Sequence, residues 1–335
     1  MGKTKTRLLW PDVAKGIGII AIILGYMGIN DINRVVFLFH VPLFFVVSGY
    51  FFKPQVPFRQ LLKNKSQTLL LPYIYTCIAI CVLSVIRAVW QRQDAAATLK
   101  SWILASLYGA GSNWESPFYI KQIGAIWFLL ALFYGFLLCW WCMQKPTSRV
   151  FILIALVFIC LLISQYVWLP TSILAGPIAA MYILIGYTAK STACFSEKGY
   201  SVVAMAACVV VLILDAWKFN GLWLVSNYFG NGILDLACTI CGVYLVIHIS
   251  RIISEKLKLL AWVLKFYGKN SLFIMCIHLI ELNVFPWEKV YESASRFGIT
   301  WVATLALVIM MKLVYVTVGT IIKELCLKVI KEKRE

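Results

Sequence analysis

Residues 150–169 read VFILIALVFICLLISQYVWL, a stretch of consecutive positions without one charged side chain. An apolar run of about 18 residues or more is long enough to cross the hydrocarbon core of a bilayer as a helix. The composition agrees, because 62% of the 335 residues are hydrophobic and only 13% are charged. Soluble domains carry about one quarter charged residues. The chain is therefore expected to be an integral membrane protein.

The other apolar runs set the fold class. They are continuous rather than alternating, which favours membrane helices over the strands of a β-barrel. We expect an all-α, polytopic membrane protein with about ten transmembrane helices, forming one domain over residues 1–335. Residues 95–108 are expected to form a helix on the surface. The expected spans are 13–30, 35–52, 69–90, 126–143, 150–169, 171–190, 200–217, 232–250, 270–286 and 299–322.

The positive charges alternate between the connections of these spans. Every second connection is rich in Lys and Arg, as in the segment holding Lys53 and Arg59 and in the basic tail at 323–335, whereas the others carry few. The positive-inside rule then predicts that both termini lie in the cytoplasm (N-in, C-in). The same rule accounts for the net charge of +17, so we expect no nucleic-acid partner.

The 11 cysteines lie almost entirely inside apolar runs. Two pairs have CxxC spacing, Cys139 with Cys142 and Cys238 with Cys241. Inside membrane helices such residues usually act as small hydrophobic side chains. No histidine stands at ligand spacing from either pair, so the sequence predicts no metal site.

Ionisable side chains within spans are costly, by about 2.5–3.5 kcal/mol on insertion scales, so each one requires an explanation. His278 and Glu281 are three residues apart and share a helix face. A carboxylate beside an imidazole fixes its tautomer and raises its basicity, as a general base requires. A buried pair that only satisfies itself is an equally good interpretation. Lys312, at similar depth in the next span, is expected to form an ion pair with Glu281.

A second group of polar side chains is expected nearer the outer leaflet. His40 lies about five residues from the outer end of its span, and Tyr26 lies at similar depth in the preceding span. Two polar groups at matched depth on adjacent helices suggest one site. The alternative is that His40 is a satisfied core residue. The Ser48-Gly49 pair permits close helix approach under either interpretation.

Several short motifs carry a family resemblance. They are WPDVAKGIG at 10–18, FHVPLFF at 39–45 with SGY at 48–50, LLLPY at 69–73, IWFL at 126–129 and GKNSL at 268–272, followed by His278. In this order and on these spans, the sequence resembles acyltransferase family 3 of integral membrane proteins, in particular the branch of bacterial sugar O-acetyltransferases such as fucose 4-O-acetylase-like proteins. The resemblance implies a membrane-bound O-acyltransferase in the bacterial plasma membrane, with acetyl-CoA as donor and a glycan or lipid-linked sugar as acceptor.

The sequence departs from the family pattern at Tyr26. The pattern has a basic residue, here Lys15, and then ten intervening residues before a histidine regarded as the catalytic base. A phenol has a reference pKa of about 10 against about 6.5 for imidazole, so tyrosine is a poor base at neutral pH. Three alternatives follow. His40 or His278 takes the proton, Tyr26 acts as a proton donor, or the activity is lost.

The resemblance also assigns roles to other side chains. Lys63 and Lys65 match the family's paired basic residues, and with Lys15 and Lys269 they are expected to bind the CoA phosphates on the cytoplasmic side. A polar path lined by Tyr26, His40, His278 and Glu281 would carry the acyl group. Substrate contacts are expected from Trp127, Tyr73, Ser48 and Asn270.

Two other functions fit the same sequence. A transporter or flippase of a lipid-linked sugar also needs polar groups at membrane depth, but it does not need CoA. A catalytically silent relative would bind a glycan lipid or a partner protein, and the tyrosine at position 26 favours it.

Overall fold

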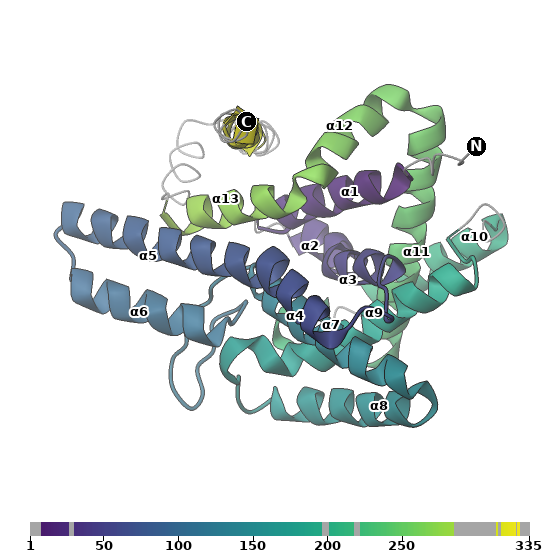
Figure 1. Cartoon of the computed structure of the whole chain (residues 1–335), viewed down its shortest axis with the longest axis horizontal. Helices are drawn as coiled ribbons and strands as arrows, with labels where there is room; N and C mark the ends of the chain where they lie inside the picture. Colours follow the sequence, from purple (N-terminus) through teal and green to yellow (C-terminus); the bar gives the residue numbers. More distant parts are fainter. Residues whose placement is uncertain are drawn as a thin grey trace.

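The structure is a computed structural model that describes residues 8–26, 30–195, 201–217, 222–284, 313, 316–325 and 327–328. These residues form helices almost throughout, with one short antiparallel pair, β1 (Leu222–Trp223) and β2 (Tyr228–Phe229). Figure 1 shows the helices in a single assembly. The helices are α1 (Trp10–Gly25), α2 (Asn30–Val36), α3 (His40–Tyr50), α4 (Phe58–Lys65), η1 (Ser66–Leu70), α5 (Leu71–Trp90), α6 (Ala95–Tyr108), α7 (Trp127–Gln144), α8 (Pro146–Ile163), η2 (Pro170–Ala175), α9 (Gly176–Ser191), α10 (Val202–Trp217), η4 (Leu224–Ser226), α11 (Ile233–Lys256), α12 (Lys258–Lys269) and α13 (Ser271–Val284).

Length and composition confirm an all-α membrane protein. Within the described residues, six helical segments are long and apolar enough to cross a bilayer. α12 and α13 pass the same test as a pair, but they bend by 67° between them. α1, with 16 residues, and the apolar part of α10 are shorter. The six segments are Ile32–Tyr50, Phe58–Trp90, Trp127–Gln144, Pro146–Ile163, Pro170–Ser191 and Ile233–Lys256.

The predicted count of ten spans and the N-in, C-in orientation stay predictions. Nine of the expected spans have a helical counterpart among the described residues, although the first is shorter than expected because α1 ends at Gly25. The tenth, 299–322, lies largely outside the described residues. The helix expected at 95–108 is α6, with the same bounds. Asp94 caps its start by accepting from the backbone N–H groups of Ala96 and Ala97, and Gly109 ends it in the left-handed conformation.

Glycines let two helix pairs approach backbone to backbone. A Cβ added to Gly268 on α12 would overlap the Asp12 carbonyl oxygen on α1, and one on Gly16 would overlap the Leu264 carbonyl oxygen. The crossing of α3 and α9 is built in the same way at Gly49 and Gly186. Helix association in membranes depends on such close packing, because lipid supplies no hydrophobic drive between helices. These crossings fix α1 and α3 within the assembly.

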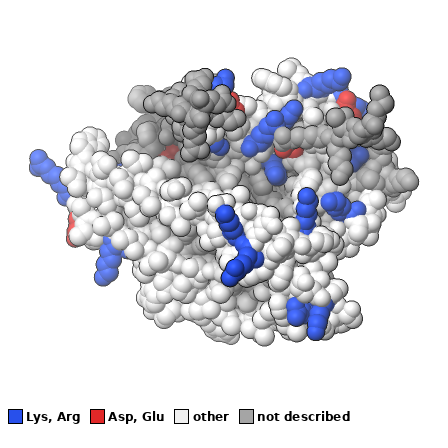
Figure 2. Space-filling view, in the orientation of Figure 1, with Lys and Arg blue, Asp and Glu red and all other residues white. Residues whose placement is uncertain are grey.

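The interior is centred on α7, most of whose side chains are buried. Phe128 of α7 packs against both Phe44 and Phe45 of α3. By contrast α8 leaves Phe151, Phe158 and other apolar side chains exposed. We expect this exposed apolar face to contact the hydrocarbon chains of lipids. Figure 2 shows wide uncharged areas between scattered basic groups, with few acidic groups in view.

Candidate functional site

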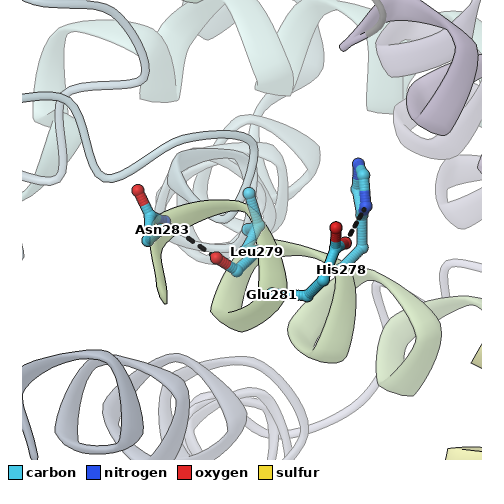
Figure 3. Close-up of polar contacts among 4 residues, drawn as sticks. All are labelled: His278, Leu279, Glu281 and Asn283. Carbon is cyan, nitrogen blue, oxygen red and sulfur yellow. Dashed lines mark hydrogen bonds and ion pairs between the residues drawn. The ribbon is translucent and has the colours of Figure 1, made fainter. Parts of the chain in front are cut away.

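The centre of the candidate site is a buried histidine–glutamate pair on α13. His278 Nδ1 lies 3.2 Å from Glu281 Oε2, and the two side chains are 0% and 8% exposed. Figure 3 shows them facing one another from the same side of the helix, whereas Asn283 donates to the Leu279 carbonyl oxygen one turn back. With Nδ1–H donating to the carboxylate, Nε2 becomes the basic nitrogen. The predicted pairing is therefore present and has the geometry of an oriented base.

Tyr26 completes this centre from a second helix. It follows the last residue of α1, and its ring meets the His278 ring edge-to-face at a centroid distance of 5.4 Å. The connection before α7 covers it, since a Cβ on Gly124 would lie 3.3 Å from the Tyr26 hydroxyl. The Ala125 backbone lies near that hydroxyl. Tyr26, at the position where the family resemblance implies a histidine, thus touches a histidine from elsewhere in the chain.

His40 belongs to a neighbouring cluster rather than to this centre. Its Nδ1 lies 2.6 Å from the Val36 carbonyl oxygen, and its ring packs on Phe37 at a centroid distance of 5.2 Å. Phe37 in turn packs against Gly25. Phe37 therefore stands between His40 and the end of α1. Of the two histidines that the sequence proposed as bases, the structure brings His278 to Tyr26.

A pocket of about 100 Å³ approaches the centre from the other end of α1. Its α1 side is formed by Lys15, Ile19 and Ile22, four residues before Tyr26. Its α13 side runs from Ser271 to Met275, three residues before His278. One helical turn, about 5.4 Å, thus separates the pocket from the Tyr26–His278 contact. The other lining residues are Phe44, Leu69, Phe128, Leu129, Leu132 and Leu272.

Two of the four predicted phosphate-binding lysines lie together near this pocket. Lys15 lines it, and the positive charges of Lys15 and Lys65 are close enough to act on one another. Lys65 Nζ also lies 3.4 Å from the centroid of the Phe136 ring, one turn along α7 from the lining residue Leu132. Lys63 and Lys269 are exposed on α4 and α12. The structure thus divides the group into a partly buried pair and two surface residues.

The four predicted substrate-contact residues do not form one surface. Trp127 is buried at the start of α7, where it packs against Gly111. Tyr73 is buried too, and its hydroxyl donates to the Ser106 carbonyl oxygen at 2.6 Å. Asn270 donates to the Phe266 carbonyl oxygen at the bend between α12 and α13. Ser48 is half-buried on α3, next to the Gly49 crossing.

Two further expectations concern ions. Lys312, the predicted partner of Glu281, lies outside the described residues. Among the residues that the structure describes, no group of three or more His, Cys, Asp or Glu side chains could hold a metal ion.

The connection before α7 contributes a part of the site that no sequence motif predicted. Gly124 packs against both Tyr26 and Leu279, which joins α1 and α13 through a third segment. Small residues such as Gly124 and Ala125 give no chemical signal. The one sequence feature that could have pointed to them is their position just before the IWFL motif at 126–129.

Comparison with protein families adds one match. A family model described as an acyltransferase domain matches residues 8–320. The matched range contains α1 through α13 and therefore every residue of the site described above. No curated protein and no solved structure matches the chain.

Proposed function

Since the chain belongs to acyltransferase family 3 and is a membrane protein, we propose that it transfers an acetyl group from acetyl-CoA to a hydroxyl of a cell-surface or lipid-linked glycan. The observation that carries this proposal is the buried His278–Glu281 pair in contact with Tyr26, one turn beyond a pocket that starts at Lys15. It brings an oriented base to within one helical turn of a pocket. In this proposal His278 is the catalytic base. The family resemblance assigns that role to a histidine at the position that Tyr26 occupies here.

The chemistry is a direct transfer. Glu281 holds the His278 imidazole with Nδ1 protonated, so that Nε2 accepts the proton of the acceptor hydroxyl. The hydroxyl oxygen attacks the thioester carbonyl carbon and forms a tetrahedral intermediate. As this collapses, the carbon–sulfur bond breaks and the CoA sulfur leaves, taking the proton from the imidazolium. An ester and free CoA result, and the histidine returns to its starting state.

The pocket favours a short acyl group. With a volume of about 100 Å³, it is expected to take an acetyl group rather than a long acyl chain. The lysines at its end, Lys15 and Lys65, would hold CoA phosphates through charge-assisted hydrogen bonds. In this proposal the donor binds on the side where α1 begins and the acceptor on the side where α1 ends.

The proposal is tested by mass analysis of surface polysaccharide from bacterial strains. A deletion strain should lose an acetyl mass, and His278→Ala should fail to restore it. His40→Gln is the matched control, because it alters the other predicted base outside the Tyr26 contact, and it should restore the acetyl mass. Unchanged glycan in both the deletion and the His278→Ala strain would overturn the proposal and favour a transporter of lipid-linked sugar.

A second candidate, a catalytically silent relative, is favoured by one observation, the tyrosine at the family's histidine position. It predicts no acetyl transfer by the natural protein and measurable transfer by Tyr26→His. Transfer by the natural protein that depends on His278 rejects it.

A further inference from the structure

Two basic side chains lie near the far end of the site, away from Lys15. Arg87, in the last turn of α5, donates from Nη1 to the Val284 carbonyl oxygen at 2.8 Å. Lys121 lies in the connection between α6 and α7, with Nζ 3.7 Å from the centroid of the Trp102 ring. Their positive charges are close enough to act on one another. In the part of the chain that the structure describes, no carboxylate forms an ion pair with either of them.

This arrangement is electrostatically unfavourable as it stands. Burial lowers the pKa of Lys121, and the Arg87 guanidinium lowers it further. Trp102 offers Lys121 the face of an aromatic ring, which attracts a cation but brings no negative charge. Two like charges in a partly buried position destabilise one another unless an anion lies between them. The pair is therefore suited to bind an anion.

The pair flanks the catalytic centre. Val284, which Arg87 holds, is three residues beyond Glu281 on α13. Lys121 is three residues before Gly124, which packs on Tyr26 and Leu279. An anion bound between Arg87 and Lys121 would thus lie beside the end of the site where the acceptor is proposed to enter.

An apolar groove of about 500 Å³ runs between the same helices, α5 and α6. The polar groups along it are already bonded within the protein. The Tyr73 hydroxyl donates to Ser106, and the Thr171 hydroxyl bonds to Tyr134. What remains is hydrocarbon surface, so the groove suits a hydrocarbon chain. Its apolar lining on these two helices comes from Ile74, Ile78, Val82, Ile103 and Leu107, and Leu70 at the end of η1 adds to it.

The groove ends close to Arg87 and Lys121, so a lipid could place its tail in the groove and its anionic head group beside these two cations. Val82, the last groove residue on α5, is followed about one turn later by Arg87. On α6 the groove residue Ile103 is next to Trp102, the ring under Lys121. α5 belongs to the membrane-crossing segment Phe58–Trp90. A lipid chain along the groove would therefore carry its head group toward the cations.

We propose that Arg87 and Lys121 bind the phosphate of a lipid-linked acceptor whose hydrocarbon tail lies in the groove between α5 and α6. The ligand class is a sugar joined to a long hydrocarbon through phosphate, and the assignment rests on the proposed glycan acylation. A guanidinium pairs with two phosphate oxygens, and an ammonium adds a point charge. The sugar next to the phosphate would then lie near His278.

The test measures binding without any acyl transfer. The wild-type protein in phosphatidylcholine nanodiscs is titrated with a fluorescent polyprenyl phosphate, with the same polyprenol lacking phosphate, and with glucose 1-phosphate, which lacks the tail. We expect the polyprenyl phosphate to bind at least about tenfold more tightly than either. Equal binding of the alcohol would overturn the phosphate site, and equal binding of glucose 1-phosphate would overturn the tail groove.

Variants separate the two parts of the site. Arg87→Gln and Lys121→Gln should each weaken polyprenyl phosphate binding about tenfold. Arg92→Gln and Lys100→Gln, which remove exposed charges from the turn after α5 and from α6, should leave it unchanged. Ile78→Trp, which fills the groove, should weaken polyprenyl phosphate binding but not glucose 1-phosphate binding. Thermal unfolding of each variant confirms folding, and Arg87→Lys tests the charge in a conservative form.

Two outcomes overturn the assignment. One is an Arg87→Gln/Lys121→Gln double variant that binds polyprenyl phosphate like the wild type. The other is displacement of the probe by phosphatidylglycerol at equal concentration, which would assign the site to bulk anionic lipid. Because binding is read directly, absence of acetyl transfer in a parallel assay would count against the proposed function and leave this result standing.

Discussion

The rings of Tyr26 and His278 meet edge-to-face, with centroids 5.4 Å apart, although the residues lie more than 250 positions apart in the chain. This contact brings the position at which the family has its histidine to a histidine on α13. Of the two histidines that the sequence offered as bases, only His278 makes this contact, whereas His40 bonds to Val36 and packs on Phe37.

His278 should therefore be the residue on which transfer depends most. We expect His278→Ala to lower acetyl transfer by about 10²–10⁴-fold, the usual contribution of general base catalysis. Acetyl-CoA binding should persist, because the pocket ends one helical turn before His278. The measurement is radiolabelled acetyl transfer beside equilibrium binding of acetyl-CoA. A larger loss in His40→Gln than in His278→Ala would contradict this assignment.

Tyr26 is expected to act mainly through its ring. Tyr26→Phe keeps the contact with His278 and should retain most of the transfer activity. Tyr26→Ala leaves a cavity beside the histidine, and truncation of a buried aromatic side chain usually destabilises a protein by about 3–5 kcal/mol. Transfer rates and thermal unfolding of both variants check this. If Tyr26→Phe is as inactive as His278→Ala, the hydroxyl itself takes part in the reaction.

The predicted ion pair between Glu281 and Lys312 can be tested by measuring the free energy of unfolding of variants. Lys312→Met leaves a buried carboxylate without its partner, and breaking a buried pair in this way usually costs about 3–5 kcal/mol. Glu281→Gln in the same chain should restore part of that loss. Unfolding in detergent of the two single variants and the double variant gives the coupling free energy. Strictly additive losses would exclude the pairing.

The glycine crossing of α1 and α12 should tolerate no added methyl group. Gly268→Ala places a Cβ on the Asp12 carbonyl oxygen, and such overpacking should destabilise the protein by about 1–3 kcal/mol. Gly242→Ala is the milder control, because its nearest neighbour is the Phe39 Cβ at 3.0 Å. The midpoint of thermal unfolding compares the two. Equal midpoints would mean that the helices can separate freely at this point.

Acceptor binding should weaken at alkaline pH because Lys121 must be charged to hold a phosphate. Burial and then Arg87 lower the pKa of Lys121 below its ordinary value, which is about 10.4. Loss of the proton therefore begins at a lower pH than for an exposed lysine, and polyprenyl phosphate affinity falls as the pH rises through this pKa. Lys121→Arg, which stays charged, should keep its affinity. Identical pH profiles for the two proteins would remove Lys121 from the site.

The pattern of apolar residues in the sequence was enough to predict an all-α membrane protein. Long apolar runs such as 150–169 have one stable form in a bilayer, a helix, because the backbone must satisfy its own hydrogen bonds there. The three-residue spacing also placed His278 and Glu281 on one face, since helix geometry alone sets that relationship. The helix expected at 95–108 has the same bounds in the structure.

Only the tertiary structure decided which polar groups share a site. Depth along a helix axis follows from counting residues, but the direction in which each helix turns its side chains depends on packing against its neighbours. His40 and Tyr26 were expected at the same depth, yet Phe37 stands between His40 and the end of α1. The position of Lys121 over Trp102 likewise depends on how the segment before α7 folds back against α6. Such contacts join segments far apart in sequence, so no local pattern encodes them.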